Sequence, residues 1–228
     1  MAGKFIKGAL VEFVETFLLP VPNVIIFQFN PETITHTWTQ PGSAGAGSNP
    51  LAVKGTPGES FSLKIAMDAN DMIADGSPVA EGLAIASGIY SRLAALEMLQ
   101  YPVSPSDSLF ATVSSAANVS ISGEKVDRGV TVSEIPTVLF VWGPERIVPV
   151  RVTTLTITET LYDSFLSPTH AEAQLELSVL IPEELDALSG KRAIIARTAY
   201  KYSLKKRQAL ALANLENAVE SIIGMLTI

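Results

Sequence analysis

Histidine offers little material for acid–base or metal chemistry, because the chain contains two histidines, His36 and His170. His36 lies among threonines in an alternating segment, and His170 lies in a turn. A histidine base needs a partner that orients it and a pocket that shifts its pKa. A small hydrolase that uses either histidine with Asp71 or Asp163 is one hypothesis, but the chain has no nucleophile motif. We expect structural roles for both histidines and no catalytic residue.

Two short segments come close to ligand-binding motifs without meeting their requirements. The acidic segment from Asp68 to Asp75 lacks the calcium-loop pattern, since Met72 and Ile73 occupy the positions where an oxygen ligand and a glycine are needed. The stretch from Gly42 to Gly47 is followed by neither Gly-Lys-Ser/Thr nor a predicted helix, so it does not match a phosphate loop. The absence of cysteine removes thiolate nucleophiles and cysteine-bound metal sites. We therefore expect no metal and no cofactor.

Basic side chains gather near the C-terminus. Residues 191–228 hold 7 Lys and Arg against 2 Asp and Glu, whereas residues 1–190 hold 9 against 21, giving formal charges of +5 and −12. The acidic body argues against general nucleic-acid binding. The basic run is a solvated helix face, a nucleic-acid or lipid-headgroup patch, or a surface that docks on an acidic protein, such as a neighbouring copy. The docking hypothesis assigns an assembly interface to Lys201, Lys205, Lys206 and Arg207.

The size and composition of the chain predict a globular protein with its own core. It has 228 residues, of which 47% are hydrophobic, enough for one large domain or one domain with an appendage. The mean hydropathy is +0.32, but charges interrupt the two most apolar stretches, Phe5 to Leu19 and Val79 to Leu99. Neither matches a membrane span or a secretory signal. We expect a cytoplasmic protein without stable membrane insertion.

Alternation of apolar and polar residues predicts an antiparallel β body. In the segment around His36, threonines 33, 35, 37 and 39 fall on one face, while Ile34, His36 and Trp38 fall on the other. Two later segments use the same device and predict an antiparallel pair around the loop Asp163 to His170. The predicted strands lie within Met1 to Leu19 and at Val24 to Asn30, Ile34 to Gln40, Phe61 to Met67, Thr137 to Trp142, Val148 to Tyr162 and Ala171 to Ile181.

Helical spacing occurs in one segment of the body and in the tail. Apolar residues recur every three or four positions from Val79 to Leu99, which predicts one strong helix. After Pro182 the chain is rich in Ala, Leu, Lys and Arg, which predicts one or two tail helices. Residues 103–133 are either extra hairpins or a long insertion, and Pro41 to Pro50 is a loop. The sequence thus predicts an α+β fold, with a β domain at 1–182 and a basic helical extension at 183–228.

Five segments in a fixed order resemble the tube and baseplate-adaptor proteins of contractile injection systems, the phage-tail-like particles that drive a tube through a membrane. They are Phe29 to Glu32 (FNPE), Phe61 to Ile65 (FSLKI), the helix at Val79 to Leu99, Pro136 to Gly143 (PTVLFVWG) and the final hairpin of Val150 to Tyr162 with Ala171 to Ile181.

The resemblance implies a phage tail-tube-like fold, with two antiparallel sheets packed as a β-sandwich or barrel around one central helix. It also implies that six copies close into a homohexameric ring. Joined sheet edges and polar strand faces would then line a channel. Members of the family often carry a C-terminal LysM module that binds peptidoglycan. This chain lacks that module's sequence pattern after Pro182.

The resemblance favours a structural ring protein at the baseplate end of the inner tube, a tube initiator that adapts the tube to the spike. The distinctive tail favours this adaptor over the alternative of a main inner-tube subunit or phage tail tube protein. Expected partners are further copies and the tube, spike and baseplate or sheath proteins of the same particle, either in the cytoplasm or released. A hypothesis of another class is a β-sandwich module that binds a carbohydrate or protein ligand.

Overall fold

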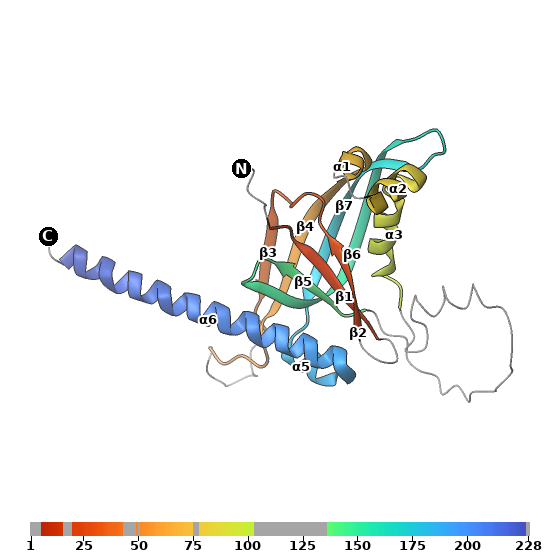
Figure 1. The fold of residues 1–228 in the computed structure, drawn as a ribbon. Helices are drawn as coiled ribbons and strands as arrows, with labels where there is room; N and C mark the ends of the chain where they lie inside the picture. The colour runs from red at the N-terminus through yellow and green to blue at the C-terminus, as the bar shows by residue number, and fades with distance from the viewer. Residues whose placement is uncertain are drawn as a thin grey trace, which may run out of the picture.

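The protein is an α+β fold built on one seven-stranded antiparallel sheet (Figure 1). The computed structural model describes residues 6–15, 20–42, 49, 51–74, 78–102 and 136–226. Five helices accompany the sheet in these ranges. The α+β class and the helical tail predicted from the sequence are confirmed.

The strand order in the sheet is β2-β1-β5-β6-β7-β4-β3, so strands that are far apart in sequence pair with one another. β1 pairs with β5, and β4 pairs with β7 over nine consecutive residue pairs, from Ser60–Ser178 to Asp68–His170. The strands are β1 (Ala9–Glu15), β2 (Pro20–Ile26), β3 (Ile34–Thr39), β4 (Gly58–Asp68), β5 (Val138–Trp142), β6 (Arg146–Tyr162) and β7 (Pro168–Val179).

Strands β3, β4, β7 and β6 form a two-faced unit, because residues paired across an antiparallel sheet share a face. One row across the four strands is Ile34, Leu63, Leu175 and Leu155, and the next row is Thr35, Ser62, Glu176 and Thr154. Apolar and polar rows alternate in this way along the strands. The apolar rows face the core, in which Phe61, Leu63, Leu175 and Leu177 are almost completely buried. The predicted separation of the Thr and Leu/Ile faces is confirmed.

The sequence predicted one helix at Val79 to Leu99, and this prediction is wrong. The segment forms α2 (Pro78–Ser87) and α3 (Tyr90–Met98), separated at Gly88, whose φ is +57°. At this break the backbone amide of Ile89 donates to the carbonyl of Pro168 at 2.8 Å, which joins the helix pair to the start of β7. A third short helix, α1 (Ala69–Ala74), lies within the acidic segment that lacks the calcium-loop pattern.

The predicted second strand is also displaced. β2 ends at Ile26, and residues 27–30 are fixed by side-chain hydrogen bonds to distant backbone. The side-chain amide of Gln28 bonds both backbone groups of Asp68. It donates to the Asp68 carbonyl at 2.7 Å and accepts from the Asp68 backbone N–H at 3.1 Å. Asn30 accepts from the Gly8 amide at 2.9 Å. These bonds bring the segment after one edge strand to the end of β4, so the sheet is curled.

The C-terminal part consists of α5 (Pro182–Ala187) and the long helix α6 (Gly190–Leu226). Figure 1 shows α6 crossing the base of the sheet and then projecting away from the body. With 37 residues, α6 is about 55 Å long at 1.5 Å per residue. No helix in the described part of the chain is long and apolar enough to span a membrane.

The expectation of two packed sheets is not met, because the seven described strands form one open sheet. The body has three short helices, where one central helix had been expected. The proposed insertion at 103–133 lies outside the described residues, as do most of the Pro41 to Pro50 loop and the Gly42 to Gly47 stretch.

Candidate assembly surfaces

The polar face of the β3–β4–β7–β6 unit is a broad surface without large apolar side chains. Its members are Thr35, Thr37 and Thr39 of β3, Ser60, Ser62 and Lys64 of β4, Glu172, Gln174, Glu176 and Ser178 of β7, and Thr154, Thr156 and Thr158 of β6. Lys64 pairs with Glu172 at 2.6 Å, and Gln174 donates to the hydroxyl of Ser62 at 2.8 Å. Cross-strand pairs of this kind hold the strands in register and leave a hydrated surface.

The two edges of the sheet differ. β2 contains Pro20 and Pro22, which have no backbone N–H to offer another strand. β3 contains no proline, and its sequence ITHTWT is rich in residues that favour strands. β3 is therefore the better edge for pairing with an added strand.

α6 is held to the body by polar contacts, by buried small side chains and by Tyr200, which packs against both apolar clusters. The buried Ser203 hydroxyl bonds both backbone groups of Ile147 at the start of β6, accepting from its amide at 3.0 Å and donating to its carbonyl at 2.6 Å. The Tyr202 hydroxyl donates to the Pro144 carbonyl at 2.8 Å. Arg197 donates to the carbonyls of Leu185 and Leu188, which ties α6 to α5.

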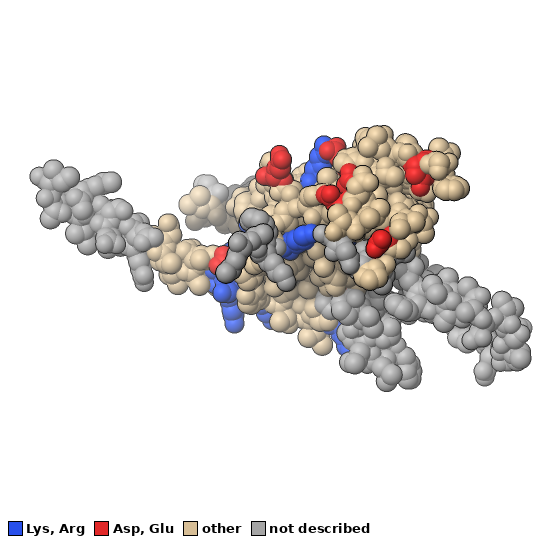
Figure 2. All heavy atoms as spheres, turned by 45° about the horizontal axis from the view of Figure 1, so that its top comes forward, with Lys and Arg blue, Asp and Glu red and all other residues tan. Residues whose placement is uncertain are grey.

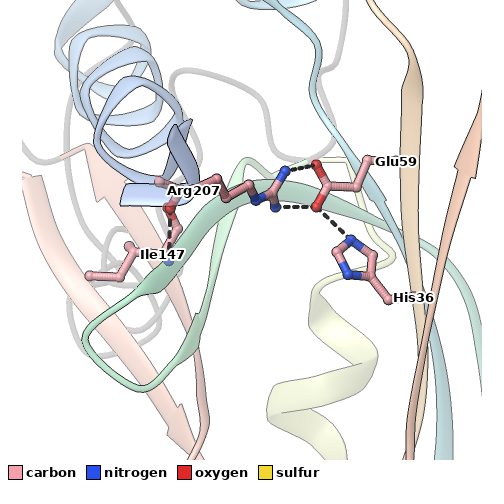
Figure 3. A network of polar contacts seen from close by, with 5 residues as sticks. His36, Glu59, Ile147 and Arg207 are labelled. Atoms are coloured by element: carbon pink, nitrogen blue, oxygen red, sulfur yellow. Dashed lines mark hydrogen bonds and ion pairs between the residues drawn. The ribbon is translucent and has the colours of Figure 1, made fainter. Parts of the chain in front are cut away.

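Arg207 completes this attachment through a salt bridge with Glu59 of β4 (Figure 3). The guanidinium contacts both carboxylate oxygens, with one hydrogen bond of 2.8 Å. Glu59 is only 8% exposed, and His36 of β3 lies 2.7 Å from its Oε1 atom. A buried carboxylate needs such partners, because desolvation without them is costly. Arg207 therefore stabilises the attachment of α6 within the same chain.

Aromatic rings surround this network. The His36 ring stacks on Phe61 at 4.0 Å between centroids, and Arg207 lies 6.0 Å from the centre of the Trp38 ring. Burial lowers the pKa of His36 below its usual value, although the Glu59 carboxylate acts in the opposite direction. Burial and the charge of Arg207 also lower the pKa of Arg146, which lies 5.5 Å from the Phe61 ring centre. The arrangement favours a neutral His36 that contributes to packing.

His170 and Asp68 form a second pair, with Nδ1 and Oδ2 3.2 Å apart. Burial alone would raise the pKa of Asp68, but hydrogen bonds from His170 and from the Asn70 and Asp71 amides lower it below its usual value. Asp163 accepts hydrogen bonds from the Phe165 and Ser167 amides, so it orders a turn. Each histidine thus has a carboxylate partner other than the Asp71 and Asp163 considered in the hydrolase hypothesis.

The four basic residues assigned to an assembly interface lie on α6, but they do not act alike. Lys201, Lys205 and Lys206 are exposed, and the Lys206 ammonium lies 5.9 Å from the centre of the Tyr202 ring. Arg207 is the member used inside the chain. In Figure 2 Lys and Arg side chains lie along the lower side of the molecule, and others lie in the upper body among Asp and Glu side chains. The three lysines remain the candidates for contact with a partner.

Comparison with models of known protein families finds no match, and comparison with curated proteins finds none either.

One feature of the sequence would have revealed Glu59. It stands two residues before Phe61 in β4, on the same side of an alternating strand, where an apolar residue is expected. A charge at such a position needs a buried partner, and Arg207 lies 148 residues away in sequence.

Among the described residues, no group of three His, Cys, Asp or Glu side chains could hold a metal ion.

Proposed function

We propose that this chain is a structural component of a contractile injection system, which forms a ring at the baseplate end of the inner tube and adapts the tube to the spike. The observation that carries the proposal is the two-faced β3–β4–β7–β6 unit. Its inner rows are apolar, and its outer rows consist of Thr, Ser, Glu, Gln and Lys. A wall of this kind suits a channel through which hydrated cargo or a tube passes. The tail-tube-like fold is part of this proposal.

Ring formation needs edges that can join. β3 is an edge strand without proline, so it can accept a strand from a neighbouring copy, and such pairing would extend the polar wall from one copy to the next. The ordered sequence motifs that resemble the family support six copies, as in a homohexamer. The particle would assemble in the cytoplasm.

α6 favours the adaptor position over that of a repeated tube subunit. It projects beyond Arg207 for 19 residues, up to Leu226, and offers an arm for a different partner protein of the particle. Lys201, Lys205 and Lys206 lie at the base of this arm and provide the positive charge for docking on an acidic surface.

The first test is the mass of the purified protein, alone and with the tube and spike proteins of the same particle, by light scattering and negative-stain imaging. The proposal expects rings of six 24.3 kDa chains with a central channel, alone or with these partners. A chain that stays monomeric and never joins a particle would overturn it.

A second test separates the lysines from Arg207. The triple variant Lys201→Glu, Lys205→Glu and Lys206→Glu keeps the internal salt bridge and is expected to melt like the wild type but to enter particles less efficiently. The control variant Lys7→Glu with Lys54→Glu reverses two other exposed charges and should enter normally. Equal incorporation of both variants would exclude the three lysines from the interface.

A further inference from the structure

The tip of the β6–β7 hairpin carries an exposed cluster of large apolar side chains, here named the apolar knuckle: Leu161, Tyr162, Phe165 and Leu166. Phe165 is 88% exposed and Leu166 is 79% exposed. Single exposed apolar residues are common on proteins, but adjacent ones at a protruding tip are typical of a contact site.

The knuckle is held in one conformation. The Asp163 carboxylate accepts from the amides of Phe165 and Ser167, each at 2.8 Å, and the Asp163 amide donates to the Ser167 carbonyl at 2.9 Å. Leu166 has a φ of +64°, a left-handed conformation that costs a non-glycine residue free energy. Behind the turn, Pro168 is bonded to the α2–α3 junction. The side chains are therefore presented by a rigid turn, which lowers the entropy cost of binding.

A complementary groove lies elsewhere on the same chain, between β2 and α3. It has a volume of about 260 Å³, and its walls include Val24, Ile26, Met67, Ala95 and Leu96. Small-molecule sites are usually larger, about 300 to 1,000 Å³. The size and the apolar lining of the groove suit one or two inserted side chains. Val24 and Ile26 are about half exposed, so the groove is not filled by the chain's own knuckle.

The charges near the two sites also match. Arg92 lines the groove, whereas desolvation and, after it, the charge of Glu159 raise the pKa of Tyr162 in the knuckle. Opposite charges at the rim of an apolar contact favour the correct pairing. The acidic surroundings of the knuckle, with Glu159 and Asp163, make insertion among anionic lipid headgroups unfavourable. These observations favour a protein occupant over a membrane.

We propose that the knuckle of one copy inserts into the β2–α3 groove of the next copy. The contact joins two different surfaces, so it is heterologous, and repetition gives a closed ring or a helical stack. One or two knuckle side chains inserted in the groove, with the others packed on its rim, would supply the apolar centre of an interface between copies. The inference rests on the proposed ring function and adds to it the residues that join neighbouring copies.

The test is complementation between two variants. The knuckle variant Phe165→Ser with Leu166→Ser and the groove variant Ala95→Glu are each expected to weaken self-association by roughly 30-fold or more, the effect of an interface hot spot. Because each variant keeps one intact surface, an equimolar mixture should form a dimer but no ring. Matched controls are Leu51→Ser, at a leucine that is 86% exposed, and Ala86→Glu, at an exposed position of α2. Melting curves check that all variants fold.

The outcomes separate this proposal from the ring proposal. Wild-type rings with unaffected variants would overturn the knuckle contact and leave the ring intact, whereas a monomeric wild type would overturn both. Two monomeric variants that do not complement each other would overturn the proposed pairing. A groove variant that still self-associates while the knuckle variant is monomeric would indicate a symmetric knuckle-to-knuckle contact and would also overturn the proposal. Binding to phosphatidylcholine vesicles that needs Phe165 and Leu166 but not Ala95, with rings unaffected, would assign the knuckle to a membrane instead.

A disulfide provides an independent measurement, because the chain has no cysteine of its own. Oxidation of a mixture of Leu166→Cys and Val24→Cys chains should give the mixed dimer in clear excess over the two homodimers. Replacing Leu166→Cys by Leu51→Cys should abolish that excess. Equal yields from the two mixtures would contradict the proposed pairing.

Discussion

The salt bridge between Arg207 and Glu59 predicts a measurable loss of stability when the guanidinium is removed. Arg207→Met keeps most of the apolar stem of the side chain but leaves the buried Glu59 carboxylate with His36 as its remaining close partner. Each hydrogen bond to a charged group is worth about 1.5 to 3 kcal/mol, and Arg207 makes two. The side chain of Arg207 is 37% exposed, so solvent screening reduces the total, and we expect a loss of about 2 to 3 kcal/mol.

The assay is urea or thermal unfolding, followed by Trp fluorescence because Trp38 lies beside Arg207. For a chain of this size the expected loss lowers Tm by about 5 to 10 °C. α6 can also detach without unfolding of the sheet, in which case the loss cannot exceed the free energy of α6 docking. Hydrogen exchange in α6 then rises while exchange in β4 and β7 is unchanged.

The matched control is Lys206→Met, which removes a neighbouring exposed charge and should change stability by less than about 0.5 kcal/mol. In a double-mutant cycle, adding Glu59→Gln to Arg207→Met should cost less than the sum of the single changes, with a coupling of about 1 to 3 kcal/mol. Equal effects of Arg207→Met and Lys206→Met on stability, or a coupling energy near zero, would refute the role of the Arg207–Glu59 salt bridge in attaching α6 to the body.

Three further predictions test the packing around the sheet. Gly88→Ala should lower the free energy of unfolding in urea by about 2 to 4 kcal/mol. Gly88 has a positive φ, and an added Cβ would lie 2.1 Å from the Pro168 carbonyl oxygen. The control Gly82→Ala in α2, where nothing lies within 4 Å of the added Cβ, should leave stability unchanged or raise it. Ser203→Ala should cost about 1 to 3 kcal/mol, since both backbone groups of Ile147 lose their partner; a cost equal to that of the exposed Thr198→Ala would contradict this. Stability should fall as pH decreases through 6.5, because the lowered pKa of His36 means that the unfolded chain binds the proton more tightly; an identical pH slope for His36→Gln in urea titrations at pH 7.5 and 5.5 would exclude His36 as the cause.

Period-2 patterns made the strands and their two faces predictable, because β4, β6 and β7 have buried residues on one side and the inner side of β3 is partly buried at Ile34 and His36. The break at Gly88 was not predictable from local spacing, since it depends on a hydrogen bond to Pro168, 80 residues later in the chain. The role of Arg207 was hidden for the same reason. A basic run on a helix looks uniform until tertiary structure places one member of it against a buried carboxylate.

The exposed knuckle also escaped the sequence interpretation, because Phe165 and Leu166 lie in a turn between two strands. Their exposure depends on how far the hairpin extends beyond the sheet, and no local pattern encodes this distance. The resemblance to tube proteins concerns polar strand faces and strand motifs, and the basic tail lies outside it. The structure adds a loop tip and a groove that no periodicity marks.

The strand order has a consequence for the synthesis of the protein. β1 pairs with β5 on the central side of the sheet, and β4 pairs with β7. In both cases the central partner is synthesised more than 100 residues after the N-terminal strand. Contacts of such long separation slow folding, because the chain must close large loops before pairing rewards it. On the ribosome, the edge of β4 that pairs with β7 stays unpaired until residue 179 has emerged. Chaperone capacity, more than intrinsic stability, is therefore expected to limit the yield of this protein in a cell.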